Sequence, residues 1–334
     1  GCTMVVKPSE LTPLTAACFA NLMEKIGLPP GVLNVLPTTR ADAVVGALLA
    51  DSRLKKLSFT GSTRVGRLLL GRAAHNIQRS SLELGGNAPF LVFQDANLDA
   101  AVDGAAQAKL RNAGQACTAA NRFLVHEAVA KEFIERLSRR FSAIGQASAR
   151  GGQLGPFISA AARENVHAMV DDAVARGARL VLGGTIPDGP GYFYPPTILA
   201  DVAPGSRVLE EEIFGPVAPV QCFASDEEAV RAANATPYGL AAYAYTADLD
   251  RALWLQEELD VGMLGINSGL VSDPSAPFGG VKQSGLGREG GIEGIEEYLS
   301  VDYAAIGRAA GPHERAGLGL ATVAAWYTGD AKCL

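Results

Sequence analysis

The sequence predicts an α/β protein built around a parallel sheet. Short apolar runs typical of strands alternate with amphipathic segments typical of helices along most of the 334 residues. This β–α–β succession is the pattern of a doubly wound sheet. The length allows two domains or one large α/β domain, and the share of apolar residues, 48%, is ordinary for a globular chain.

The first part of the chain contains three predicted strands and two predicted helices. Thr12 is the expected N-cap of the first helix, Pro13 occupies its first position and Gly27 ends it. A parallel strand needs neighbours, so a sheet that opens on an isolated strand indicates a fragment. The predicted strands cover residues 4–6, 31–37 and 54–62, and the helices cover 12–26 and 41–51.

A second series of elements begins near Gly86. The predicted strands cover 89–93 and 122–126, the helices cover 98–110 and 128–144, and glycine- and proline-rich loops cover 145–160 and 188–197. The stretch from about Arg308 is rich in Ala and Gly and has no clear period, so it is predicted to be a tail.

Charge and composition favour a small-molecule ligand. The net charge is −6, with 29 basic and 35 acidic residues spread without long blocks, so no nucleic acid or membrane surface is expected as a partner. The 5 cysteines and 4 histidines show neither a disulfide framework nor metal-ligand spacing. We therefore expect no metal and a reducing compartment, the cytoplasm or the mitochondrial matrix, and not secretion.

Two segments could bind a dinucleotide. Residues 57–70 read as a strand, a glycine turn and a helix start, where backbone N–H groups and the helix dipole bind phosphate. The segment matches neither a Walker loop nor Gly-x-Gly-x-x-Gly, and a plain strand-to-helix turn has the same pattern. Lys7 and Glu10 follow another strand and could hold ribose hydroxyls, or be two solvated surface charges.

Glu83 and Cys117 are the candidates for chemistry. Glu83 lies between two leucines just before a Gly-Gly turn, where a buried carboxylate would have a raised pKa suited to a general base; an exposed glutamate at a strand end is the alternative. Cys117 follows a predicted helix and has small neighbours. Near a cation such as Arg111 it could be a thiolate nucleophile, whereas a buried cysteine would be apolar filler.

Six motifs together resemble the NAD(P)-dependent aldehyde dehydrogenases. They are "KPSE", "FTGST", "LELGG", "RNAGQAC", "EEIFGPV" and "PFGGVKQSGLGREG", in the family's order and approximate spacing over residues 1 to about 307. The variants "KLRNAGQAC" and "GIEEYL" resemble the succinate-semialdehyde dehydrogenase branch. The resemblance implies a partial Rossmann-like cofactor domain plus an α/β catalytic domain. It places them at 1–85 and 86–285, followed by a return segment and oligomerisation strand at 286–307 and a tail at 308–334.

The resemblance also implies roles for the chemical groups. Cys117 would attack the aldehyde to form a thiohemiacetal, hydride would pass to the nicotinamide, and Glu83 would activate the water that hydrolyses the resulting thioester. Arg111 would hold the distal carboxylate of succinate semialdehyde, with Ser272 as a second candidate for the same ligand. The remaining implied residues would bind the cofactor: Lys7 and Glu10 at the adenosine ribose, Gly61, Ser62 and Gly66 at the pyrophosphate, and Leu84, Glu212 and Phe214 near the nicotinamide.

NAD is expected over NADP, because Glu10 would accept hydrogen bonds from a free ribose 2′-hydroxyl and repel a 2′-phosphate, although the Lys7 ammonium would attract a phosphate.

The strand over 295–307 implies a homodimer or homotetramer. The family's oxyanion-hole asparagine and a second substrate arginine match no residue of this sequence, since both belong to segments upstream of residue 1. A catalytically impaired dinucleotide-binding or subunit-interaction fragment is therefore the alternative. The segment "CTA" also lacks the Cys-x-Cys of a redox switch.

Overall fold

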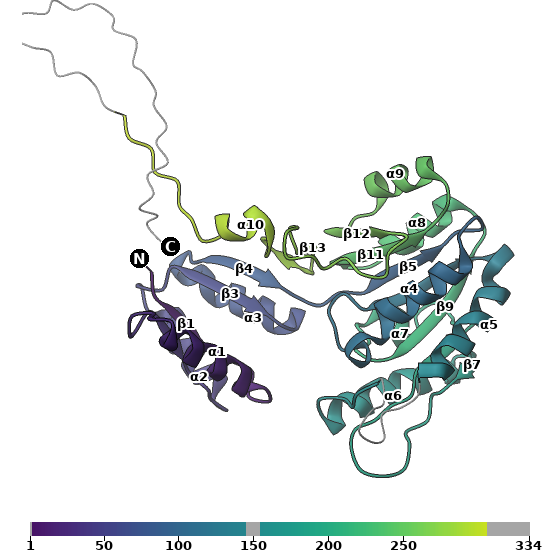
Figure 1. Cartoon of the computed structure of the whole chain (residues 1–334), viewed down its shortest axis with the longest axis horizontal. Coiled ribbons are helices and arrows are strands. Elements are labelled where there is room, and N and C mark those ends of the chain that lie inside the picture. The colour runs from purple at the N-terminus through teal and green to yellow at the C-terminus, as the bar shows by residue number, and fades with distance from the viewer. Residues whose placement is uncertain (1, 145–153, 306–334) are drawn as a thin grey trace, which may run out of the picture. The chain divides into compact units, whose positions relative to one another are not determined.

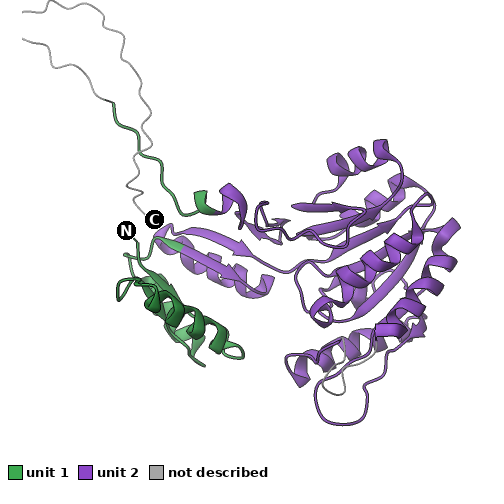
Figure 2. Ribbon diagram, viewed as in Figure 1, with its two compact units in different colours: residues 1–56, 295–334 green, residues 57–294 purple. Residues whose placement is uncertain are grey.

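The computed structural model describes residues 2–144 and 154–305, and these form two compact units (Figure 2). Unit 1 comprises residues 1–56 and 295–334, and unit 2 comprises residues 57–294. The predicted tail after Gly307 and most of the predicted loop 145–160 lie outside the described residues. The domain boundaries expected from the sequence, at 85, 285 and 307, stay predictions.

Unit 1 contains a two-stranded parallel sheet and the two predicted helices, whereas the third strand predicted for this part of the chain, β3 (Lys56–Thr60), belongs to another sheet. The elements of unit 1 are β1 (Met4–Val6), α1 (Pro13–Lys25), β2 (Leu33–Val35) and α2 (Ala41–Ala50). Pro13 opens α1 and Gly27 follows its end with a φ of +91°, both as expected. Thr12 occupies the N-cap position, but its side chain makes no capping hydrogen bond. Lys56 and Glu297 form an ion pair at 3.0 Å that joins the two segments of this unit.

The core of unit 2 is a seven-stranded sheet in the order β12-β11-β5-β6-β9-β8-β7 (Figure 1). All neighbouring strands are parallel except β7, which runs antiparallel to β8. The strands are β5 (Ala88–Val92), β6 (Ala120–His126), β7 (Arg179–Leu182), β8 (Thr197–Ala200), β9 (Val217–Phe223), β11 (Ala241–Tyr245) and β12 (Met263–Ile266).

Helices cover both faces of this sheet, because alternate strand residues point to opposite sides. Phe90 and Tyr243 pack with α4 and α5 on one face, whereas Leu91 and Ala242 pack with α8 and α9 on the other (Figure 1). The helices of unit 2 are α3 (Thr63–Ala73), α4 (Leu98–Leu110), α5 (Glu127–Ile144), α6 (Ala160–Ala175), α7 (Arg207–Glu210), α8 (Asp226–Asn234), α9 (Leu249–Glu258) and the start of α10 (Gly291–Glu296). Two 3₁₀ turns cover Ala74–Asn76 and Arg111–Gly114.

A second sheet in unit 2 has the order β14-β4-β3 and carries Glu83. Its strands are β3 (Lys56–Thr60), β4 (Arg79–Glu83) and β14 (Gly285–Leu286), and a short pair joins β10 (Tyr238–Gly239) to β13 (Val281–Lys282). Gly285 pairs with Glu83 across the antiparallel β14–β4 ladder. A Cβ on Gly285 would lie 1.9 Å from the carbonyl oxygen of Leu82, so only glycine allows this approach.

The strand expected over 295–307 is not formed in the described part of that range, residues 295–305. Ile295 and Glu296 end α10, and residues 301–305 have no regular secondary structure. Val301 and Tyr303 are 89% and 72% exposed. A strand that adds to another subunit's sheet has no partner within one chain, so oligomerisation stays a prediction. Among the described residues, no helix is long and apolar enough to cross a membrane, and no three His, Cys, Asp or Glu side chains cluster as metal ligands would.

Candidate active site

Cys117 lies in a tight turn between α4 and β6. The preceding residues Asn112, Ala113 and Gly114 all have positive φ, at +52°, +56° and +73°, a conformation that costs free energy for non-glycine residues and concentrates at functional sites. A Cβ on Gly114 would lie 2.2 Å from the carbonyl oxygen of Gly215, so the turn packs directly on that segment. The thiol is left half-buried beside the main core.

The pKa of the Cys117 thiol is raised, first by burial and then by the nearby carboxyl groups of Glu212 and Glu83. Backbone N–H groups of Cys117 and Thr118 act in the opposite direction. Arg111 is not among the groups that shift this pKa, and the thiolate nucleophile expected near that cation stays a prediction. The free thiol is mainly protonated at neutral pH and needs a proton acceptor before it can attack.

Glu83 ends β4 and is 4% exposed, so the alternative of an exposed strand-end glutamate is wrong. Burial raises its pKa to about 8, Glu289 adds to this shift, and Arg288 opposes it. Its Oε2 atom is buried and has no hydrogen-bond partner among the described residues. The Oε1 atom lies against Gly279, where an added Cβ would come within 2.8 Å. A neutral carboxyl group with a free oxygen is suited to proton transfer near neutral pH.

Glu212 lies between the cysteine turn and the Gly85-Gly86 turn. Its Oε1 accepts a hydrogen bond from the Gly86 N–H at 3.2 Å, and a Cβ on Gly85 would lie 2.5 Å from its Oε2. Burial raises the pKa of Glu212 to about 7, against the effects of the Gly86 N–H and of Lys109. A Cβ on Gly86 would lie 2.6 Å from the Cys117 carbonyl oxygen. The Gly85-Gly86 turn therefore contacts both the side chain of Glu212 and the backbone of Cys117.

Lys109 was not identified from the sequence, and it is the buried cation of this site. Its ammonium donates to Asn121 Oδ1 at 2.8 Å, and its side chain is fully buried. Burial lowers its pKa to about 7, while Glu212 acts to raise it. The only sequence signal was a lysine within the apolar part of a predicted helix, which is also the pattern of a lysine whose stem is buried and whose end reaches water.

The glycine turn expected to bind phosphate ends at the N-terminus of α3. Ser62 is the N-cap and its Oγ accepts from the Val65 N–H at 3.4 Å, while Gly61 bonds the Glu83 carbonyl through its N–H at 3.0 Å. Gly66 packs on Leu84, where an added Cβ would meet a methyl carbon at 2.5 Å. This packing joins the start of α3 to the segment of Glu83.

Phe214 and Glu10 are exposed, whereas Lys7 is half-buried. Phe214 is 42% exposed and has a φ of +51°, a strained conformation for an aromatic residue on the surface. Lys7 Nζ lies 3.3 Å from Glu10 Oε2. These two residues belong to unit 1, and their part in a site with residues of unit 2 stays a prediction.

Arg111 is an exposed cation whose guanidinium donates to the Thr118 hydroxyl oxygen at 3.3 Å. Within residues 2–144 and 154–305, no acidic side chain forms an ion pair with it. Ser272 lies half-buried in the segment between β12 and β13, and its role as a second ligand for the same carboxylate stays a prediction.

Comparison with known proteins places this site in a family. The model of the aldehyde dehydrogenase family matches residues 1–303. The chain belongs to the aldehyde dehydrogenase family. It is 54% identical over 316 residues to a succinate-semialdehyde dehydrogenase of Paenarthrobacter nicotinovorans, covering 94% of this chain and 70% of the relative. It is 45% identical over 309 residues to a 3-sulfolactaldehyde dehydrogenase of Pseudomonas putida, covering 92% and 63%.

Solved structures agree with this assignment. An Escherichia coli NADP-dependent enzyme superposes with a TM-score of 0.87 at 46% identity, covering 90% of this chain and 62% of that one. The chain thus spans about 62 to 70% of the length of these aldehyde dehydrogenase relatives. The aldehyde dehydrogenase fold predicted from the six motifs is confirmed.

Proposed function

We propose that this aldehyde dehydrogenase chain carries the thiol and the base for NAD(P)-dependent oxidation of an aldehyde with an anionic far end, succinate semialdehyde foremost. One observation carries the proposal: a half-buried thiol on a strained turn, with a neutral buried carboxyl group near it and, on the same turn, an arginine that forms no ion pair with the described residues. Structural cysteines need none of these neighbours.

The protein groups would act in two stages. In the first, the Cys117 sulfur attacks the aldehyde carbon, the π electrons of the carbonyl move to oxygen, and the thiol proton passes to that oxygen to give a thiohemiacetal. Loss of the carbon-bound hydrogen as hydride, for which a bound nicotinamide would supply the acceptor, and of the hydroxyl proton to water would leave a thioester on Cys117. In the second stage, Glu83 takes a proton from water, the hydroxyl attacks the thioester carbon, and Cys117 leaves as a thiolate. Activity should rise with pH as Glu83 ionises, through about 8.

The residues of unit 2 fit the nicotinamide and phosphate groups of a dinucleotide. The strained, exposed ring of Phe214 and the carboxylate of Glu212 would hold the nicotinamide end, and the N-terminus of α3 at Gly61 and Ser62 would hold the phosphates. Glu10, whose carboxylate is exposed, would accept from a ribose 2′-hydroxyl, which favours NAD. The two dissociation constants, measured by fluorescence quenching, test this preference, and tighter binding of NADP would contradict it.

Arg111 supports the choice of substrate. A guanidinium without an acidic partner can bind a carboxylate through two parallel N–H groups, and two relatives at 54% and 45% identity are named for aldehydes that carry a carboxylate or a sulfonate. Arg111→Ala should lower the specificity constant for succinate semialdehyde by about 10- to 150-fold. Butanal, which lacks the carboxylate, should be nearly unaffected. Equal losses for the two aldehydes would contradict the role of Arg111 in binding the substrate carboxylate.

The activity is tested by NAD(P)H formation with succinate semialdehyde, with Cys117→Ala as the control. Turnover that disappears in Cys117→Ala supports the proposal. A folded chain that binds NAD(P) without turnover would instead support a dinucleotide-binding or subunit-interaction role.

We expect a homodimer or homotetramer, because Ile295, Val301 and Tyr303 expose apolar surface at the expected subunit contact. Light scattering that shows a clean monomer would contradict this assembly.

A further inference from the structure

Thr118, the residue after the nucleophile, accepts hydrogen bonds at both its side-chain hydroxyl oxygen and its main-chain carbonyl oxygen. Its hydroxyl oxygen accepts from the Arg111 guanidinium at 3.3 Å, and its carbonyl oxygen accepts from the Tyr243 hydroxyl at 2.8 Å. Thr118 itself is 3% exposed. These two hydrogen bonds come from different parts of the fold and meet on one residue that is covalently joined to Cys117.

The first hydrogen bond fixes the direction of the Arg111 side chain. Arg111 begins the 3₁₀ turn after α4, and its bond to Thr118 closes the loop that contains the positive-φ residues and Cys117. A guanidinium has five N–H donors, so the single bond to Thr118 leaves the others for an anion. A long, exposed arginine would otherwise sample many rotamers, and ordering it on binding costs free energy.

The second hydrogen bond anchors Thr118 to the sheet. Tyr243 lies on β11, is 1% exposed, and its ring centroid lies 6.0 Å from that of Phe90 on the neighbouring strand. Burial raises the pKa of the Tyr243 hydroxyl to about 12, so it is a protonated donor at neutral pH. The bond therefore joins the cysteine turn to the centre of the core, two strands away from β6.

We infer that Thr118 and Tyr243 are positioning residues: Tyr243 fixes the main chain of Thr118, and the Thr118 hydroxyl holds the Arg111 guanidinium in place beside Cys117 for the anionic end of the substrate. The inference deepens the proposed function and rests on it. In this account, the Thr118 side chain, next to the nucleophile, helps the site to select an anionic over a neutral ligand.

The test uses two alkylating reagents of similar size, anionic iodoacetate and neutral iodoacetamide. Their rates at Cys117, measured by mass spectrometry of its peptide, give a ratio that reports the arginine and cancels the ionisation of the thiol. The readout needs no turnover. It also separates Cys117 from the exposed Cys2, Cys18 and Cys222.

Arg111→Leu should lower the iodoacetate to iodoacetamide ratio by about 10- to 100-fold, the range for a charge-assisted contact. Thr118→Val, which has the same shape without the hydroxyl, should lower it by about 3- to 10-fold, as for one hydrogen bond. Thr118→Ser keeps the oxygen and should restore the ratio. Tyr243→Phe should lower the ratio, whereas Tyr245→Phe should not, because the Tyr245 hydroxyl packs on Gly104 of α4 instead.

The outcomes distinguish the positioning role of Thr118 from the role of Arg111 in binding the anionic end of the substrate. A fall in the ratio for both Arg111→Leu and Thr118→Val supports the inference. A fall for Arg111→Leu alone, or equal falls for Thr118→Val and Thr118→Ser, overturns the inference and leaves the role of Arg111 standing. An unchanged ratio in Arg111→Leu overturns both. Thermal unfolding of each variant shows whether it is folded, and an effect of Tyr243→Phe that Tyr245→Phe reproduces overturns the role of Tyr243.

Discussion

Replacing Glu83 by glutamine should remove a pH-dependent loss of stability. Burial raises the pKa of this carboxyl group from its ordinary 4.5 to about 8. Between these values the unfolded chain has released a proton that the folded chain keeps, so the free energy of unfolding falls as the pH rises. At about 1.4 kcal/mol per pH unit, the difference amounts to roughly 5 kcal/mol above pH 8 as an upper bound, and less where the site relaxes.

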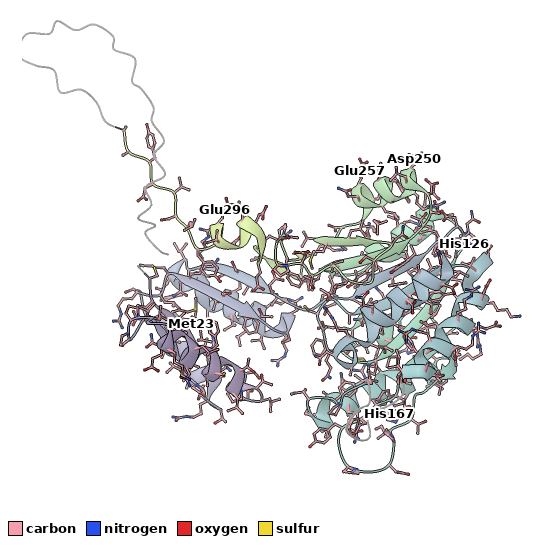
Figure 3. The ribbon with its side chains drawn as sticks, in the orientation of Figure 1. Met23, His126, His167, Asp250, Glu257 and Glu296 are labelled. Atoms are coloured by element: carbon pink, nitrogen blue, oxygen red, sulfur yellow. The ribbon has the colours of Figure 1, made fainter. Side chains whose placement is uncertain are left out.

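The assay compares urea unfolding of the wild type and Glu83→Gln at pH 5 and at pH 8.5. The variant should gain stability relative to the wild type by several kcal/mol between the two pH values, because glutamine has no proton to release. Glu257→Gln is the matched control, since Glu257 is exposed on α9 (Figure 3). Parallel pH profiles for the wild type and Glu83→Gln would refute the reasoning, because they would show that Glu83 ionises alike in both states.

Three other side chains or turns give testable changes in stability or reactivity. Arg122→Met removes three hydrogen bonds to buried backbone carbonyls and should lower the free energy of unfolding by about 3 to 5 kcal/mol; a loss below about 1 kcal/mol in urea unfolding would contradict it. Gly114→Ala should destabilise by more than about 2 kcal/mol, because its φ is +73° and its Cβ would meet the Gly215 carbonyl oxygen; an unchanged melting temperature would contradict this. Glu212→Gln removes a carboxylate that raises the pKa of Cys117, so alkylation by iodoacetamide at pH 8 should become faster, and a slower rate would contradict the electrostatic account.

Local sequence pattern was sufficient to predict individual helices and strands. The predicted helix over 12–26 is Pro13–Lys25, and the predicted strand over 89–93 is Ala88–Val92. Both carry signals within a few residues of each other: a proline at the helix start with a glycine after its end, and a continuous apolar run for a strand buried on both faces. The motif order identified the family for the same reason, because each motif is a short local sequence.

The electrostatics of the site depends on contacts between distant segments. Glu83 pairs with Gly285 and is acted on by Arg288 and Glu289, about 200 residues later in the chain. The sequence leaves both a buried and an exposed Glu83 open, because the neighbouring leucines do not show what packs on the carboxylate. The sign of the shift at Cys117 could not be predicted from local sequence for a related reason: after burial, the groups that raise this pKa are Glu212 and Glu83, and both lie in distant segments of the chain.

The most direct test of the central claim is to look for an acyl group on Cys117. Glu83→Gln is incubated with NAD and succinate semialdehyde, and the peptide that contains Cys117 is analysed by mass spectrometry. Because the glutamine of this variant cannot take a proton from water, a succinyl thioester that hydroxylamine releases should accumulate on Cys117, with NADH formed in equal amount. A variant that is folded and binds NAD, yet shows neither the acyl group nor NADH, would contradict the account.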